Sequence, residues 1–221
     1  MNPSIVAIDG PAGSGKTTLA RRLALALDVP HVNTGSTYRA VAREALRHGV
    51  SPDDARRLVE LAGSIEFSIS DSSAPPSLFV GGAPPGDELL SPDVEGIVSQ
   101  VSRHQEVRAA LRRVQRRLAE GGAVVEGRDI GTVVFPEATV KFFLRADPSE
   151  RAARRLEERG VEDPELAEAL ARRDAMDAET NPFVPAEDAI VIETTGRDAD
   201  EVFDEALAAV RRALDALDER R

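Results

Sequence analysis

The chain has 221 residues, of which 42% are hydrophobic, and a formal net charge of −11. It contains no cysteine and only three histidines, which excludes disulfides and thiolate metal sites and argues against a zinc site. The acidic balance opposes sequence-independent binding to nucleic acid, and no apolar run approaches the roughly 18 residues that span a bilayer. We therefore expect one sizeable core, no nucleic-acid partner and no membrane span. Because the chain enters a strand without a leader, we also expect a cytoplasmic protein.

The first predicted element is a short apolar strand over residues 4–9, which leads into a glycine-rich segment and then a helix. The segment fits the phosphate-binding spacing G-x-x-x-x-G-K-[ST]. In that motif backbone N–H groups surround a nucleotide phosphate, the lysine reaches the β- and γ-oxygens, and the next hydroxyl can bind Mg²⁺. The predicted phosphate-binding residues are Gly10, Pro11, Ala12, Gly13, Ser14, Gly15, Lys16, Thr17 and Thr18. Lys16 is the catalytic candidate and Thr17 the candidate Mg²⁺ ligand.

Beyond this loop the pattern alternates between helices and buried strands, which predicts an α/β fold with five core strands. Residues 151–179 are dense in Arg, Glu and Asp and predict a helical arm on the surface. The other predicted elements are a helix at 19–27, a strand at 29–33, a helix at 36–48, a small antiparallel pair within 65–86, a helix at 105–120, strands at 123–126, 138–144 and 189–193, and a final helix at 200–217.

Phosphate-competent residues follow the ends of two further strands, as TGSTYR at 34–39 and EGRDIGT at 126–132. In open α/β sheets, ligands bind at the carboxyl ends of the strands. Arg39 and Arg128 are therefore expected to face the phosphates held by Lys16 across one crevice. The chain has no Asn-Lys-x-Asp segment of the kind that reads guanine, which argues against a GTPase.

Six segments together resemble the bacterial cytidylate kinases. They are IDGPAGSGK at 8–16, TGSTYR at 34–39, VSQVS at 98–102, VRAAL at 107–111, EGRDIGTVVFP at 126–136 and AEDA at 186–189. The match extends over nearly the whole chain, and the run at 126–136 is its most specific part. The resemblance implies a monomeric transferase that moves the γ-phosphoryl group of ATP to CMP or dCMP with Mg²⁺, in pyrimidine metabolism.

The resemblance also implies the fold, an α/β P-loop kinase with a five-stranded parallel sheet flanked by helices, an inserted nucleotide-binding subdomain and a helical lid. We expect one domain over 1–221. Its core would comprise 1–34 and 97–221, the inserted acceptor-binding region 35–96, and the lid about 155–183.

The resemblance also implies which residues bind the acceptor and which are catalytic. The CMP-binding positions are Thr34, Tyr38, Arg39, Ser99, Arg108, Arg128, Asp129 and Asp177, and the catalytic positions are Lys16, Arg128 and Arg173. Cytosine presents an amino donor at N4 and acceptors at N3 and O2, so its reader needs a carboxylate and a donor. Asp129, Arg108 and Ser99 match the base-reading positions and supply that set. Thr34, Arg39 and Arg128 match the phosphate-binding positions, where guanidinium forks suit phosphate oxygens.

Simpler interpretations exist for single residues. Asp129 could form a local ion pair with Arg128, Arg39 could be solvated, Tyr38 could only pack, and Lys141 reads as structural. Asp9, at the end of the first strand, is a candidate partner for a water on the metal.

The predicted lid departs from the family pattern. An arginine is expected after Asp177, but residues 178–181 supply none, and Arg172, Arg154 or Arg151 could replace it. Leu90 also stands where many relatives have arginine. Two other functions stay open: a P-loop kinase for UMP, AMP or shikimate, and a regulatory or nucleic-acid-associated P-loop protein, which the acidic charge disfavours.

Overall fold

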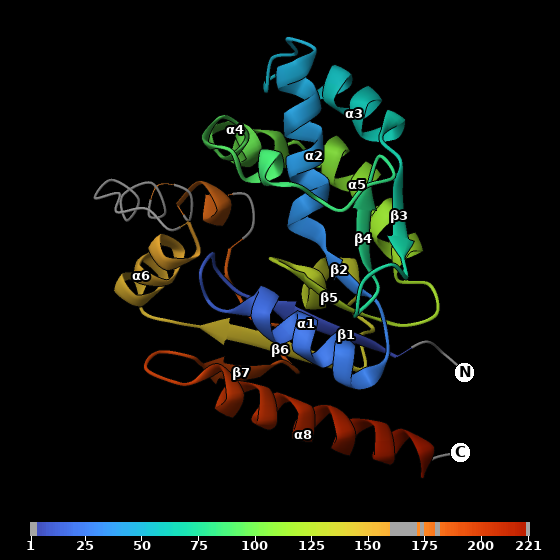
Figure 1. Ribbon diagram of the computed structural model, residues 1–221, viewed down its shortest axis with the longest axis vertical. Coiled ribbons are helices and arrows are strands. Elements are labelled where there is room, and N and C mark those ends of the chain that lie inside the picture. The colour runs from blue at the N-terminus through green and yellow to red at the C-terminus, as the bar shows by residue number, and fades with distance from the viewer. Residues whose placement is uncertain (1–3, 160–171, 173–174, 180–181, 220–221) are drawn as a thin grey trace.

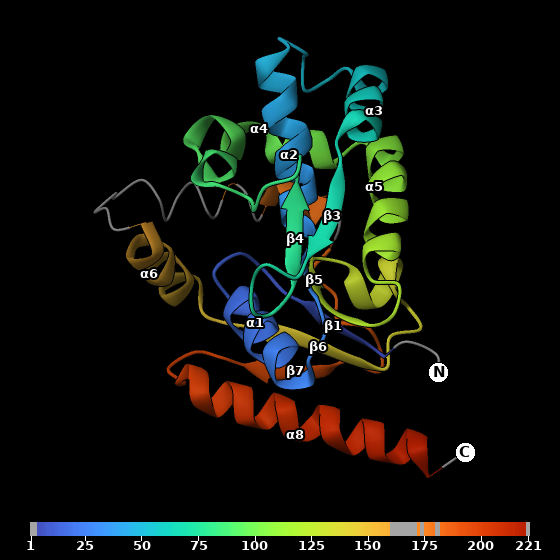
Figure 2. The same ribbon diagram turned by 45° about the vertical axis from the view of Figure 1, so that its right-hand side comes forward.

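The structure is a computed structural model that describes residues 4–159, 172, 175–179 and 182–219 (Figure 1). A twisted sheet carries helices on both faces, and α8 runs along one face while α2, α3 and α5 lie beyond the other (Figures 1 and 2). The strands are β1 (Ile5–Asp9), β2 (His31–Asn33), β3 (Phe67–Ser70), β4 (Ser77–Val80), β5 (Ala123–Gly127), β6 (Val140–Arg145) and β7 (Ile190–Glu193). The helices are α1 (Lys16–Leu27), α2 (Thr34–Arg47), α3 (Ala55–Ser64), α4 (Pro92–Ser102), α5 (Gln105–Leu118), α6 (Pro148–Arg159) and α8 (Ala199–Asp218), with short turns at Asp87–Leu90 and Ile130–Val134.

The sheet has seven strands in the order β3-β4-β2-β5-β1-β6-β7. The six from β4 to β7 are parallel, and β3 runs antiparallel to β4. The predicted parallel α/β sheet is confirmed, but the prediction of five strands is wrong. The hairpin of β3 and β4, expected as a separate excursion, joins the edge of β2, where His31 N–H donates to the Pro76 carbonyl at 2.8 Å. The open backbone edge of β2 provides the hydrogen-bonding groups for this addition.

Successive side chains of β1 point to opposite faces of the sheet, and the interior has one apolar core on each face. Ile5 and Ala7 face a core shared with α2, α3, α4 and α5, while Val6 and Ile8 face a core shared with α1 and α8. All of β1 is buried, which is expected of a central parallel strand that is covered on both faces. The division of the chain into core, inserted region and lid stays a prediction. Among the helices that the structure describes, none is both long and apolar enough to cross a membrane.

Register brings three strand ends together. Asp9 at the end of β1 lies opposite Gly127 at the end of β5, and Asn33 at the end of β2 lies opposite Glu126. The phosphate loop, the start of α2 and the loop after β5 therefore leave the same edge of the sheet. This is the edge at which α/β proteins bind ligands.

A buried carboxylate holds two of these loops together. Asp9 accepts the backbone N–H of Ile130 through Oδ1 and that of Gly131 through Oδ2, both at 2.7 Å. Burial raises the pKa of Asp9 to about 6, although the two backbone hydrogen bonds and the Lys16 charge act in the opposite direction. The phosphate loop begins at the residue after Asp9, so this carboxylate ties it to the loop after β5.

We expect Gly127→Ala to destabilise the fold, because a Cβ there would lie 2.5 Å from Thr34 Oγ1 and 2.7 Å from Ile130 Cδ1. The expected loss is about 1–3 kcal/mol of unfolding free energy, measured by chemical denaturation. Gly96→Ala, in the middle of α4, is the control, because a Cβ there meets nothing within 4 Å. That control should be neutral or stabilising by up to about 1 kcal/mol. Equal stability of the two variants would contradict the close packing at Gly127.

The raised pKa of Asp9 predicts that the folding stability of the protein decreases as pH rises through its titration range. The folded chain binds the proton on the Asp9 carboxyl group more tightly than the unfolded chain does. This proton therefore stabilises the folded state at low pH, and the stabilisation is lost as pH rises from 3.8 to about 6. The stability of wild type relative to Asp9→Asn should fall by about 2 kcal/mol between about pH 4 and about pH 6.5. Denaturant unfolding across this range measures it. Parallel curves for the two proteins would show that Asp9 does not titrate in this window.

Candidate active site

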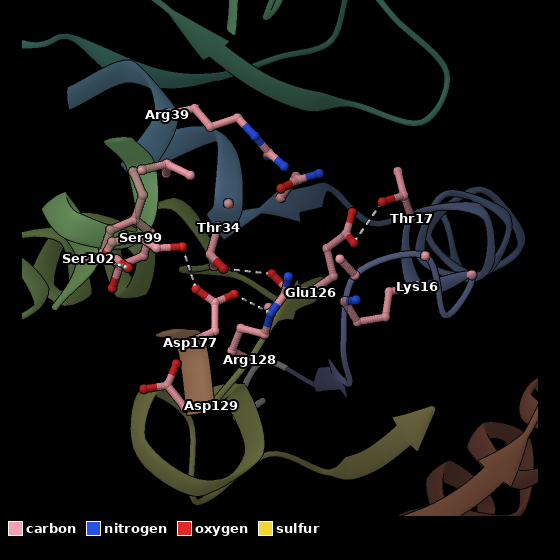
Figure 3. A pocket seen from close by; sticks show the side chains of 18 of the residues that line it. Lys16, Thr17, Thr34, Arg39, Ser99, Ser102, Glu126, Arg128, Asp129 and Asp177 are labelled. Atoms are coloured by element: carbon pink, nitrogen blue, oxygen red, sulfur yellow. Dashed lines mark hydrogen bonds and ion pairs between the residues drawn. The ribbon is translucent and has the colours of Figure 1, made fainter. Parts of the chain in front are cut away.

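A single pocket collects residues from all three strand ends (Figure 3). Every predicted acceptor residue lines it. Its lining comprises Ala12, Gly13, Gly15, Lys16, Thr17, Thr18, Asn33, Thr34, Gly35, Tyr38, Arg39, Val98, Ser99, Ser102, Arg108, Glu126, Gly127, Arg128, Asp129, Arg155 and Asp177. The two sets of residues that the sequence predicts separately, for a nucleotide phosphate and for an acceptor, therefore share one cavity.

The phosphate loop adopts a conformation that depends on glycine. Gly13 has φ +72°, and a Cβ at this position would lie 2.6 Å from the Arg151 carbonyl oxygen. Six of the nine predicted loop residues line the pocket, while Gly10, Pro11 and Ser14 complete the turn. The loop ends at the N-terminus of α1, where the helix dipole favours an anion.

Lys16 is the first residue of α1 and is buried. Its ammonium group donates to the Pro11 carbonyl at 2.5 Å and lies 3.4 Å from Ser14 Oγ. Burial, together with the nearby Arg128 charge, holds the pKa of Lys16 well below its ordinary value. An anion in this loop would stabilise the charged form, as a phosphate-binding lysine requires.

Glu126 is a functional candidate that sequence reasoning missed. Its Oε2 accepts from Thr17 Oγ1 at 2.9 Å, and its Oε1 lies 2.8 Å from His31 Nε2. Burial alone would raise the pKa of Glu126, but the hydrogen bond and charge of His31, with Lys16 and Thr17, bring it below its ordinary value. Glu126 is therefore an ionised carboxylate beside the predicted metal ligand. The available signal was its position, as the acidic last side chain of a buried strand and the first residue of the specific run at 126–136.

The oxygen donors at this end of the pocket suit Mg²⁺. The Thr17 hydroxyl and the Glu126 carboxylate are hydrogen-bonded to each other inside the pocket, and Mg²⁺ takes one or two protein oxygens together with phosphates and waters. Asp9 has a different arrangement, because both of its oxygens accept backbone N–H groups. These contacts hold two loops together, and the expectation that Asp9 partners a water on the metal stays a prediction.

At the opposite end of the pocket, Asp129 pairs with Arg108 on α5, with Nη2 to Oδ2 at 2.5 Å. The simpler interpretation, an ion pair between Asp129 and its neighbour Arg128, does not describe this contact. Arg128 instead donates from Nε to Asp177 Oδ2 at 3.3 Å, and Asp177 Oδ1 accepts from Ser99 Oγ at 2.8 Å. Figure 3 shows Asp177 between Ser99 and Arg128, so one carboxylate bridges two predicted acceptor residues.

The start of α2 contributes the third part of the acceptor side. Thr34 Oγ1 donates to the Glu126 carbonyl at 2.7 Å, which connects the ends of β2 and β5. Arg39 is buried and its Nε donates to Glu95 Oε1 at 3.1 Å, so the solvated interpretation of Arg39 is wrong. Burial raises the pKa of Tyr38 to about 12, so its phenol is neutral, and its ring packs against the apolar core while it also lines the pocket.

Three arginines on α6 have different surroundings. Arg151 donates to the carbonyl of Ala12 at 3.0 Å, and Arg154 donates to Thr194 Oγ1 at 3.0 Å. These contacts support the phosphate loop and β7 from outside the pocket. Arg155, which no sequence motif indicated, lies on α6 and lines the pocket.

Two further predictions concern charged residues outside this constellation. Arg173, the predicted lid catalyst, lies outside the described residues, and so does most of the predicted lid at about 155–183. Lys141 donates to Asp188 Oδ1 at 2.8 Å, a contact that agrees with its structural interpretation.

Comparison with known proteins gives matches over most of the chain. The cytidylate kinase family model matches residues 6–212. A cytidylate kinase from Caldanaerobacter subterraneus is 40% identical over 215 residues, covering 94% of each chain. One from Halalkalibacterium halodurans is 42% identical over 217 residues, covering 95% of this chain and 98% of the relative.

Among solved structures, an uncharacterized protein from Eubacterium ventriosum has a TM-score of 0.55 at 15% identity, covering 95% of this chain and 98% of its own. At that identity the likeness concerns the fold alone. The family match and the identity of the relatives confirm the resemblance that the six sequence segments indicate, and the chain belongs to the cytidylate kinase family.

Proposed function

We propose that this protein transfers the γ-phosphoryl group of ATP to CMP and dCMP, giving ADP and CDP or dCDP. One observation carries the proposal. The phosphate loop with Lys16 and the acceptor residues Arg128 and Asp129 open into the same pocket, so donor and acceptor can meet without leaving the protein. Membership of the cytidylate kinase family supports the choice of acceptor.

On the donor side, the loop N–H groups and the N-terminus of α1 bind the ATP phosphates, and the Lys16 ammonium stabilises charge on the γ-phosphoryl group as it moves. Thr17 and Glu126 would hold Mg²⁺, which would offset negative charge on the ATP phosphates. His31 keeps Glu126 ionised and fixes the direction of its carboxylate. The reaction needs no covalent intermediate, because the rate gain comes from positioning and charge neutralisation.

On the acceptor side, the guanidinium groups of Arg39 and Arg128 bind the monophosphate, and Thr34 contributes a hydroxyl. These groups place a phosphate oxygen in line with the γ-phosphoryl group above Lys16. Asp177 binds the ribose, and it already lies within the pocket against Ser99 and Arg128.

Asp129, Arg108 and Ser99 read the base. The Asp129 carboxylate accepts from the cytosine amino group, and Arg108, which holds Asp129 at 2.5 Å, also supplies a donor for the acceptors at N3 and O2. Uracil places an oxygen where cytosine has its amino group, so it would face a carboxylate and leave polar groups unpaired.

The remaining expectations form part of the same proposal. Residues 1–34 and 97–221 act as the core, 35–96 as the acceptor-binding region, and about 155–183 as a lid that excludes water. Arg173 supplies a lid cation. For the arginine that residues 178–181 lack, we propose Arg155, which lines the pocket, in place of the expected candidates Arg172, Arg154 and Arg151. The protein acts in the cytoplasm as a monomer, with ATP, CMP and dCMP as its partners.

An acceptor screen tests the proposed reaction. With ATP and Mg²⁺, we expect phosphorylation of CMP and dCMP to exceed that of UMP, AMP and shikimate, measured by nucleotide chromatography. Lys16→Ala is the matched control, and it should lose about a hundredfold or more of kcat because the ammonium acts on transition-state charge. Full activity on another acceptor and none on CMP would reject the substrate assignment. ATP hydrolysis without any acceptor would indicate a regulatory P-loop protein.

Asp129→Asn tests base reading. An amide in place of the carboxylate offers a donor toward uracil O4 and weakens the contact to the cytosine amino group. The ratio of kcat/KM for CMP to that for UMP should therefore shrink, with roughly 1–3 kcal/mol at stake. Glu137→Gln is the control, since Glu137 pairs with Arg116 on the surface beyond the same loop. An unchanged ratio in folded Asp129→Asn would remove this residue from base recognition.

A further inference from the structure

Glu95 is a largely buried carboxylate to which the proposed function gives no role. It lies on α4, which packs beside α2, and Arg39 Nε donates to its Oε1 at 3.1 Å. The Arg39 side chain is 10% exposed and the Glu95 side chain 15% exposed. Because both side chains are largely buried, salt screens this ion pair less than it would an exposed pair.

Contacts with Glu95 and Gly35 orient the Arg39 guanidinium over the pocket. Glu95 engages its Nε, and on another side the guanidinium lies against Gly35, where a Cβ would be 3.0 Å from Nη1 and 3.8 Å from Cζ. Gly35 and Arg39 both line the pocket, and Figure 3 shows Arg39 extending over it from α2. The orientation of the guanidinium is therefore set before any acceptor arrives.

We infer that Glu95 is a positioning residue for the acceptor phosphate, acting by holding the Arg39 guanidinium in its binding orientation. This inference rests on the proposed role of Arg39 in binding that phosphate. An arginine side chain has many rotamers, and ordering it on binding would weaken the affinity for the acceptor. Glu95 supplies that order in advance.

The negative charge of Glu95 also repels the acceptor phosphate. Glu95 therefore has two opposite effects on acceptor binding, because orienting Arg39 strengthens it and charge repulsion weakens it. Glu95→Gln separates them, because an amide oxygen still accepts from Arg39 Nε but carries no charge. Glu95→Ala removes both the charge and the acceptor. If orientation dominates, only the second variant weakens acceptor binding.

A second ion pair on α2 provides a matched control. Arg43, four residues after Arg39, pairs with Glu88, whose side chain is 63% exposed. Arg43 is not among the residues that line the pocket. Glu88→Ala therefore removes a carboxylate partner from another arginine of α2 without touching the proposed acceptor site.

The experiment is steady-state kinetics on the full chain with CMP and ATP varied separately. We expect Glu95→Ala to raise KM for CMP roughly tenfold and leave KM for ATP within about twofold. Glu95→Gln should stay within about threefold of wild type for both substrates, and Glu88→Ala should match wild type. Thermal unfolding shows whether each variant is folded, and Glu95→Met, which keeps the length of the side chain, replaces Glu95→Ala if that variant does not fold.

A double-mutant cycle tests whether Glu95 acts through Arg39. Arg39→Ala should itself raise KM for CMP, and adding Glu95→Ala to it should cause no further change. An unchanged or lower KM for CMP in Glu95→Ala, or an equal rise in both backgrounds, would overturn the inference. The proposed function fails separately, if wild type does not phosphorylate CMP or if Arg39→Ala leaves KM for CMP unchanged.

Discussion

The two backbone hydrogen bonds that the Asp9 carboxylate accepts connect the donor and acceptor sides of the pocket. The phosphate loop starts at the next residue, and the bonded N–H groups of Ile130 and Gly131 directly follow Arg128 and Asp129. A shift in either loop would therefore be transmitted to the other. The raised pKa of Asp9 shows that burial outweighs the stabilisation of the charged form by these bonds, so this connection is made at some expense of stability.

The pocket tolerates several buried charges because each has a partner of opposite sign or a hydrogen bond. Glu126 is held by Thr17 and His31, and the acceptor arginines are each held by a carboxylate. Removing one member of such a pair would leave an uncompensated charge at low dielectric, which is strongly destabilising. The three acceptor arginines are therefore each paired with a carboxylate before the pocket is filled.

Sequence reasoning located the phosphate loop and the acceptor residues because each follows a strand end and carries a diagnostic spacing. It missed Glu126 as a site residue, since a carboxylate at the end of a strand has no spacing motif of its own, and its link to Thr17 depends on strand register. It also missed the attachment of β3 and β4, because edge pairing to β2 depends on backbone groups and not on side chains. The pairing of Asp129 with Arg108, 21 residues away, likewise required the packing of α5.

Pairs that are distant in sequence also explain how the acceptor region is ordered. Arg39 and Glu95 are 56 residues apart, and they meet because α2 and α4 pack side by side. Arg128 and Asp177 are 49 residues apart and meet at the opposite wall of the same pocket. Each guanidinium is thus held by an element other than its own, so its direction follows from the packing of the fold. An acceptor phosphate entering this pocket meets donors that are already oriented, and orientation of this kind lowers the barrier for phosphoryl transfer.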